Sequence, residues 1–230
     1  MSEIGVFTFR TLPTSRYESS PPNDRFDRND LIRKMVGENR RVLELGCSTG
    51  FVSKLLKQSG CSVVGVEIDP VAAEAAAKIC DRVIVADLSL PEWMDQAKGQ
   101  FEVILMGDVL EHLVAPDILL RSLTPLLLPG GYIVLSLPNV VHWTQRLKVL
   151  AGRFRYQAVG LLDVTHLRFF DLPTARALLT KSGYDIETFH PIIGGKFSSY
   201  LRPFWQFLAY CLPNLFGYQF LFKAKRRDTI

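Results

Sequence analysis

The sequence predicts an α/β fold: one seven-stranded, mostly parallel sheet with helices on both faces. Short apolar runs alternate along the chain with helix-like stretches, and this alternation is typical of parallel strands joined by helical crossovers. The chain has 230 residues, 48% of them hydrophobic, which is enough for one large core but short for two independent domains. We therefore expect a single domain over residues 1–230.

Apolar periodicity and turn residues place the expected elements. Strands are expected near 41–45, 62–66, 82–86, 101–106, 131–137, 184–190 and 217–224. Helices are expected near 29–36, 51–58, 70–79, 116–127 and 172–182. Residues 1–28 are polar and contain several prolines, so we expect an irregular arm there that packs over a ligand through Tyr17 or Phe26.

The first expected strand ends in a glycine-rich turn. The apolar run at 41–45 stops at Gly46, and Gly50 opens the helix expected at 51–58. A strand, a tight turn and a helix start present backbone N–H groups to a ligand. Glu44 stands at the end of this strand, where its charge would repel a pyrophosphate but attract a cationic group.

Acidic residues also end the next two strands. Glu67 is expected at an exposed strand tip, where it could accept hydrogen bonds from ribose hydroxyls, and Asp87 suits an adenine amino group. A single acid after a strand is often only a helix cap. Three acids at successive strand ends, including Glu44, favour a nucleoside site.

These segments resemble the motifs of class I S-adenosylmethionine-dependent methyltransferases. Residues 44–50 resemble the acidic-x-Gly-x-Gly-x-Gly motif, with Ser48 at the middle glycine, where we expect an altered loop contact but retained binding. Residues 101–113 resemble the fourth strand and its loop, and residues 128–134 the turn into the fifth strand. The resemblance covers about residues 40–190 and implies a Rossmann-like sheet whose antiparallel last strand lies beside strand six.

The resemblance implies S-adenosyl-L-methionine as the cofactor and S-adenosyl-L-homocysteine as its product. This cofactor carries an ammonium and a sulfonium and no phosphate, which agrees with the acidic strand ends. Cys47 is expected as a small residue lining the turn and not as a nucleophile. The cofactor-binding residues implied are Glu44, Gly46, Cys47, Ser48, Gly50, Glu67, Ile68, Asp87, Leu88 and Gly107.

Two insertions, at 139–170 and 194–214, are expected to form the substrate pocket, because ligands of open α/β sheets bind beyond the carboxyl ends of the strands. Both are rich in aromatic residues, and the first is also basic. This composition fits a solvated amphipathic helix or a contact with a membrane or lipid-like substrate, and both alternatives stay open. The layout is loosely similar to ubiquinone-biosynthesis O-methyltransferases. The substrate-binding candidates are His142, Trp143, His166 and Arg168.

Methyl transfer needs mainly positioning, although a hydroxyl acceptor also benefits from a base. The catalytic candidates are His112 and His166, with Asp108 and His142 as further possibilities, and each histidine has a purely structural role as an alternative. The aromatic insertions favour methylation of oxygen on a bulky, partly apolar small molecule. N-methylation of a sugar or amine, or a non-catalytic S-adenosylmethionine-binding module, remain alternatives.

Several other classes fit less well. The acidic strand end disfavours a nicotinamide oxidoreductase, and the segment after strand four lacks the Asp-Pro-Pro-type motif of nucleic-acid methyltransferases. A net charge of +4 requires no polyanionic partner, so no nucleic acid is expected. The four cysteines have no metal-ligand spacing, and no metal is expected.

The stretch from Pro203 to Phe222 is uncharged, but prolines interrupt it. We expect a helix at Phe204–Leu212 and a Pro-Asn turn there in preference to a membrane span. No leader segment is recognised. The expectation is a cytoplasmic monomer or homodimer, with peripheral membrane contact as an open alternative.

Overall fold

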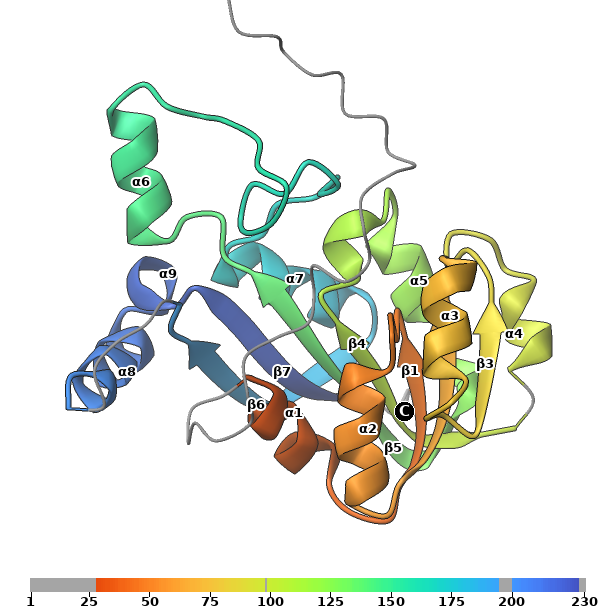
Figure 1. The fold of residues 1–230 in the computed structure, drawn as a ribbon. Coiled ribbons are helices and arrows are strands. Elements are labelled where there is room, and N and C mark those ends of the chain that lie inside the picture. The colour runs from red at the N-terminus through yellow and green to blue at the C-terminus, as the bar shows by residue number, and fades with distance from the viewer. Residues whose placement is uncertain (1–27, 98, 195–199, 228–230) are drawn as a thin grey trace, which may run out of the picture.

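The structure is a computed structural model that describes residues 28–97, 99–194 and 200–227 (Figure 1). The expected N-terminal arm, with Tyr17 and Phe26, lies outside these residues except for Arg28. The strands are β1 (Arg41–Leu45), β2 (Ser62–Glu67), β3 (Arg82–Val85), β4 (Phe101–Gly107), β5 (Leu127–Pro138), β6 (Tyr184–Ile192) and β7 (Gln219–Arg226). The α-helices are α1 (Arg28–Val36), α2 (Phe51–Gln58), α3 (Pro70–Ala76), α4 (Trp93–Gln96), α5 (Pro116–Ser122), α6 (Trp143–Leu150), α7 (Leu172–Lys181), α8 (Arg202–Cys211) and α9 (Pro213–Phe216).

The strands form one sheet in the order β3-β2-β1-β4-β5-β7-β6. The β1 strand pairs in parallel with β2 and with β4, whereas β7 runs antiparallel between β5 and β6. The predicted Rossmann-like, mostly parallel sheet with an antiparallel last strand is therefore confirmed. Strand order reverses direction between β1 and β4, and ligands of such sheets bind at the carboxyl ends of the strands at this point.

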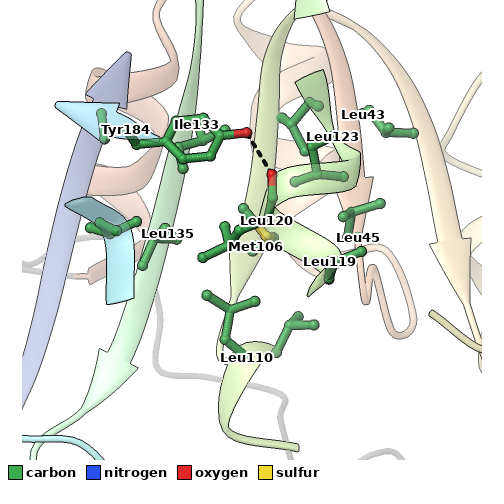
Figure 2. Close-up of a cluster of buried hydrophobic side chains, with 14 of the residues drawn as sticks. Leu43, Leu45, Met106, Leu110, Leu119, Leu120, Leu123, Ile133, Leu135 and Tyr184 are labelled. Atoms are coloured by element: carbon green, nitrogen blue, oxygen red, sulfur yellow. Dashed lines mark hydrogen bonds between the residues drawn. The ribbon is translucent and has the colours of Figure 1, made fainter. Parts of the chain in front are cut away.

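One face of the sheet is covered by α4, α5 and α7. Side chains alternate along each strand, so Leu43 and Leu45 of β1 point to this face and join a large apolar cluster (Figure 2). In this cluster the Tyr184 hydroxyl of β6 donates a hydrogen bond of 2.8 Å to the Leu120 carbonyl of α5. That bond attaches the helix to the far edge of the sheet.

The opposite face is covered by α1, α2 and α3. Val42 of β1 points here, together with Ile32 of α1, Leu56 of α2 and Ala76 of α3. Glu44 shares the direction of Val42 by the same alternation. The acid is thereby placed on the face where α2 begins.

Some element boundaries differ from the expectations. The helix expected at 116–127 ends at Ser122 and continues as a short 3-10 helix, η3 (Thr124–Leu126), because Pro125 cannot supply the backbone donor of a longer α-helix. The helix expected at 70–79 ends at Ala76. The Pro-Asn turn expected after α8 is instead the short helix α9.

The two expected insertions lie at the same side of the sheet, with α6 after β5, and with α8 and α9 between β6 and β7 (Figure 1). The buried Asn139 amide joins them, since its Nδ2 donates to the carbonyls of Gly217 at 2.6 Å and Asn214 at 3.1 Å. Among the described helices, none combines the length and apolar character needed to cross a bilayer.

Candidate active site

The turn from β1 to α2 requires glycine at Gly46. Gly46 has φ of 70°, and a Cβ there would lie 2.7 Å from Cγ2 of Val109. Its N–H donates to the Val66 carbonyl at 2.8 Å, which binds the turn to β2. Gly50 has φ of 83° at the start of α2, where a Cβ would lie 3.2 Å from the Ala76 backbone. The turn is therefore compact, and side chains cannot enter it at either glycine.

Glu67 holds the other side of this turn. Its Oε2 accepts the Ser48 N–H at 2.7 Å, and its Oε1 accepts the N–H groups of Ile68 and Asp69 at 3.0 Å each. The expected exposed strand tip is wrong, because Glu67 is only 9% exposed. Ser48 has φ of 48°, so the residue replacing the family's middle glycine keeps a glycine-like backbone, as its bond to Glu67 requires.

Glu44 lies beneath the turn and is 4% exposed. Ser53 of α2 donates its hydroxyl proton to Glu44 Oε2 at 2.5 Å. Burial raises the pKa of Glu44 to about 8, although the Ser53 hydrogen bond acts in the opposite direction. Near neutral pH the ligand-free protein therefore carries a protonated carboxyl here, and a cationic ligand would favour its ionised form.

A cavity of about 990 Å³ opens at the carboxyl ends of β1, β2 and β4. Its wall includes nine of the ten expected cofactor residues: Glu44, Gly46, Cys47, Ser48, Glu67, Ile68, Asp87, Leu88 and Gly107. Gly50 is outside the wall and shapes the turn behind it. At the other end the wall is formed by Asp108, Val109, His112, Leu113 and Thr165. The cavity thus joins the three acidic strand ends to one of the candidate catalytic histidines.

Cys47 is buried at 3% exposure beside Cys80. A hydrogen bond with Cys80 and burial both raise the pKa of the Cys47 thiol. Thiolate is the nucleophilic form of cysteine, so these surroundings support the expected role of a small lining residue.

Asp108 follows β4 in a left-handed conformation, with φ of 57°. Its Oδ2 forms an ion pair of 2.7 Å with Arg28, and its Oδ1 accepts hydrogen bonds from Ser136 and Gln219. Both oxygens of the Asp108 carboxylate are therefore bound to neighbouring side chains, and the carboxylate connects α1, β5 and β7. Arg28, Ser136 and Gln219 are not recognisable as partners of Asp108 from the sequence, because they are far from it along the chain.

His112 and His166 are brought together although 53 residues separate them in sequence. Their ring centroids are 4.9 Å apart, and Nδ1 of His112 lies 3.1 Å from the Thr165 carbonyl oxygen. Glu111, 1% exposed, adjoins both rings. Burial raises the pKa of Glu111, and burial together with the neighbouring His112 lowers the pKa of His166.

None of the four substrate-binding candidates, His142, Trp143, His166 and Arg168, is part of the cavity wall. His142 caps α6, with Nδ1 2.8 Å from Thr144 Oγ1, and its ring packs edge-on against Tyr218. Burial lowers the pKa of His142 to about 4. Trp143 lies beside it, with ring centroids 5.7 Å apart. The guanidinium of Arg168 donates to the Val114 carbonyl at 2.5 and 2.9 Å, so it fastens the insertion to the loop after β4.

The sheet, the glycine turn and the acidic strand ends define the fold of a class I S-adenosylmethionine-dependent methyltransferase. Residues 22–188 match the methyltransferase domain family, and the chain belongs to this family. The predicted class is confirmed, and S-adenosylmethionine is the cofactor of that class.

Similar proteins include enzymes of quinone biosynthesis. The ubiquinone biosynthesis O-methyltransferase of Bordetella avium is 28% identical over 122 residues, which are 49% of this chain and 49% of that protein. The mitochondrial human enzyme of the same name is 23% identical over 169 residues, 70% of this chain and 45% of that protein. The aligned segments thus span about half the length of these relatives.

The fold also matches solved structures. Magnesium protoporphyrin IX methyltransferase from Synechocystis PCC 6803, solved with bound S-adenosylhomocysteine, aligns with a TM-score of 0.57 and 18% identity. The alignment covers 87% of this chain and 82% of that one. At this identity the likeness establishes the shared fold.

Proposed function

We propose that this protein transfers the methyl group of S-adenosylmethionine to an oxygen atom of a bulky, partly apolar small molecule. The observation that carries the proposal is the continuous cavity from Glu44, Glu67 and Asp87 to His112. The acidic end suits a nucleoside with a cationic amino acid tail, and the histidine end suits a hydroxyl acceptor. The relatives named as O-methyltransferases support the choice of oxygen.

In the proposed reaction the acceptor oxygen attacks the methyl carbon, and the carbon–sulfur bond breaks with its electron pair left on sulfur. The products are the methyl ether and S-adenosylhomocysteine. Most of the acceleration comes from holding the oxygen and the methyl carbon in line. The hydroxyl proton passes to His112 or His166, and the lowered pKa of His166 keeps that ring neutral and able to accept it near pH 7.

The insertions support a large acceptor with apolar parts. The described residues of both insertions expose large apolar side chains, and the helices of the two insertions lie at one side of the sheet (Figure 1). The exposed apolar residues are Leu147, Val149, Leu150, Phe154, Tyr156, Val159, Leu167, Phe169, Tyr200, Leu201, Phe204, Phe207, Tyr210 and Leu212. Phe197, an aromatic residue of the second insertion, lies outside the described residues. Contiguous exposed apolar groups mark interaction sites more often than single ones do.

Two successive experiments test the proposal: the first measures ligand binding and the second measures turnover. S-adenosylmethionine and S-adenosylhomocysteine should raise the melting temperature of the protein, and NAD should not. Incubation with methyl-labelled cofactor and a metabolite extract should then give a labelled product whose mass spectrum places the methyl group on oxygen. Stabilisation by NAD alone, or cofactor binding without any labelled product, would contradict the proposal.

Histidine variants distinguish O-methylation from two alternatives, N-methylation and cofactor binding without catalysis. A neutral amine needs no assisting base, so an N-methyltransferase should keep its kcat when His112 and His166 are separately changed to Asn. An O-methyltransferase should lose kcat much more than cofactor affinity in the same variants. A non-catalytic S-adenosylmethionine-binding module would bind the cofactor in all variants and label nothing.

Peripheral membrane contact is part of the proposal for the first insertion. Arg153 and Arg155 are exposed beside exposed Leu150, Phe154 and Tyr156, a combination that suits anionic lipid headgroups and the acyl boundary. The double variant Arg153→Glu/Arg155→Glu should sediment less with anionic liposomes than the unaltered protein. The matched control is Lys78→Glu/Arg82→Glu, which reverses two exposed charges near β3. Equal sedimentation of all three proteins would leave the insertion as a lid.

The oligomeric state, monomer or homodimer, is measured by light scattering.

A further inference from the structure

Three side chains that can bind metals converge beside the cavity, at His112 of its wall. Glu111 and His112 belong to the 3-10 helix η2 (Leu110–His112), and His166 belongs to the first insertion. One ligand atom from each of them lies within 4.8 Å of the others. The group therefore has the spacing of a single ion-binding site.

Two of these side chains have buried polar atoms without partners. Oε2 of Glu111 and Nδ1 of His166 are buried and accept no hydrogen bond, and Glu111 is 1% exposed. Buried polar atoms are nearly always paired, and a buried carboxylate without a partner is costly. A cation held between these two atoms would satisfy both.

The remaining ring nitrogens are already occupied by backbone groups. Nδ1 of His112 bonds the Thr165 carbonyl at 3.1 Å, and the His166 ring bonds the backbone of Leu161. Because Nδ1 of His166 has no partner, that bond uses its Nε2. Histidines that ligate metals almost always donate their other N–H in this manner. The arrangement leaves Nε2 of His112 and Nδ1 of His166 with free lone pairs.

Backbone hydrogen bonds hold the segment that contains Glu111 and His112 against the segment that contains His166. The carbonyl of Glu111 accepts the N–H of Leu167 at 2.8 Å and the N–H of Arg168 at 3.0 Å. These bonds hold the two residues that follow His166 against Glu111, the residue that carries the carboxylate. The three ligand atoms are therefore positioned by the fold before any ion arrives.

We propose that Glu111, His112 and His166 bind one divalent first-row transition cation, with Zn²⁺ and Mn²⁺ as the ions to test. Two imidazole nitrogens and one carboxylate oxygen suit such ions and leave coordination positions open. Of the three ligands, only His112 is part of the cavity wall, so the ion would lie next to the cavity on the side of this residue. The proposal departs from the expectation, made from cysteine spacing, that no metal is bound.

The ion would give these histidines a different part in the reaction. This step rests on the proposed function: an acceptor hydroxyl that binds the ion becomes more acidic. Its proton leaves to solvent, and its oxygen attacks the methyl carbon. His112 and His166 then hold the ion and no longer act as bases. Ion binding itself does not depend on methyl transfer.

The test titrates metal-free protein with ZnCl₂ and MnCl₂ by calorimetry, and with CoCl₂ by visible absorption. The unaltered protein should bind one ion per chain. Loss of an outer-shell partner of a metal ligand typically weakens metal affinity by about 10–100-fold. Loss of a ligand itself should weaken ion binding by more than this in each of the variants Glu111→Gln, His112→Asn and His166→Asn. Circular dichroism establishes that each variant is folded.

Two matched controls separate this site from surface binding. His190→Asn removes a histidine that bonds Tyr210 away from the cavity, and Cys211→Ser removes an exposed thiol. Both should bind the ion as the unaltered protein does. No saturable site in the unaltered protein, or equal affinity in folded Glu111→Gln and His166→Asn, would overturn the proposal.

Thermal shift with S-adenosylmethionine on the same metal-free samples keeps the two proposals apart. Cofactor binding without ion binding would remove only the metal site. Ion binding without cofactor binding would remove the proposed function and leave the metal site standing.

Discussion

Single residues in the β1–α2 turn are constrained by backbone conformation and by space at the same time. Gly46 combines φ of 70° with a contact of 2.7 Å for any added Cβ, whereas Gly130 has φ of 77° and nothing within 4 Å. The two positions therefore share the conformational cost and differ in the steric one. Their comparison isolates what the close approach of Val109 contributes.

Gly130→Ala should lower the free energy of unfolding by about 1–2 kcal/mol, the cost of a left-handed alanine. Gly46→Ala should lower it further and should also weaken S-adenosylmethionine binding, because Val109 must move at the cavity wall. Chemical denaturation and calorimetry measure the two effects. Equal losses of stability with unchanged cofactor affinity would show that Gly46 does not shape the site.

Glu44 couples ligand binding to a proton. Its pKa of about 8 leaves the carboxyl mostly protonated at pH 7 in the ligand-free protein, and a cationic ligand favours the ionised form. S-adenosylmethionine binding at pH 7 should therefore release close to one proton, and affinity should rise with pH up to about 8. Calorimetry in buffers of different ionisation enthalpy measures the release. Glu44→Gln should abolish it, and a buffer-independent heat in the unaltered protein would refute this role.

Among the elements, the two insertions are held at their bases by Asn139. Its Nδ2 bonds the Gly217 and Asn214 carbonyls, and its Oδ1 accepts the Val141 N–H at 3.2 Å. These bonds connect the segment before α6 with the segment after α9. The two insertions thus form one connected unit at their bases.

Asn139→Ala should lower the free energy of unfolding by about 2–3 kcal/mol, because buried carbonyls lose their donor. It should also increase proteolytic cleavage near α8, which depends on this attachment. Gln206→Ala is the comparison, since it removes one bond of 2.6 Å from α8 to the Pro191 carbonyl and should cost about 1 kcal/mol. A smaller loss for Asn139→Ala than for Gln206→Ala would contradict the anchoring role.

For the whole molecule, the raised pKa of Glu44 makes stability depend on pH. The Glu44 carboxyl of the folded ligand-free protein retains its proton up to about pH 8, while in the unfolded chain it releases the proton near the ordinary glutamate pKa of 4.5. The stabilisation is therefore complete below pH 4.5 and is lost as pH rises through 8. The free energy of unfolding should fall between pH 5 and pH 9, by an amount on the order of a few kcal/mol. Urea denaturation measures this slope, which Glu44→Gln should flatten.

The sheet, the glycine turn and the acidic strand ends could all be predicted from the sequence. Apolar runs and glycine turns are local patterns, and parallel strands joined by helices bring their carboxyl ends to one edge. Nine of the expected cofactor residues therefore line one cavity. Local pattern was less informative at helix ends, such as the early end of α5 before Pro125.

The contacts between side chains far apart along the chain could not be predicted from the sequence. The ion pair of Arg28 with Asp108 and the convergence of Glu111 and His166 depend on packing across the sheet. His142 and Arg168 look like substrate ligands in sequence but are bound to neighbouring groups. Local pattern records which residues a strand carries and in which direction they alternate. It does not record which loops close over the strand ends, because that depends on the packing of segments far apart along the chain.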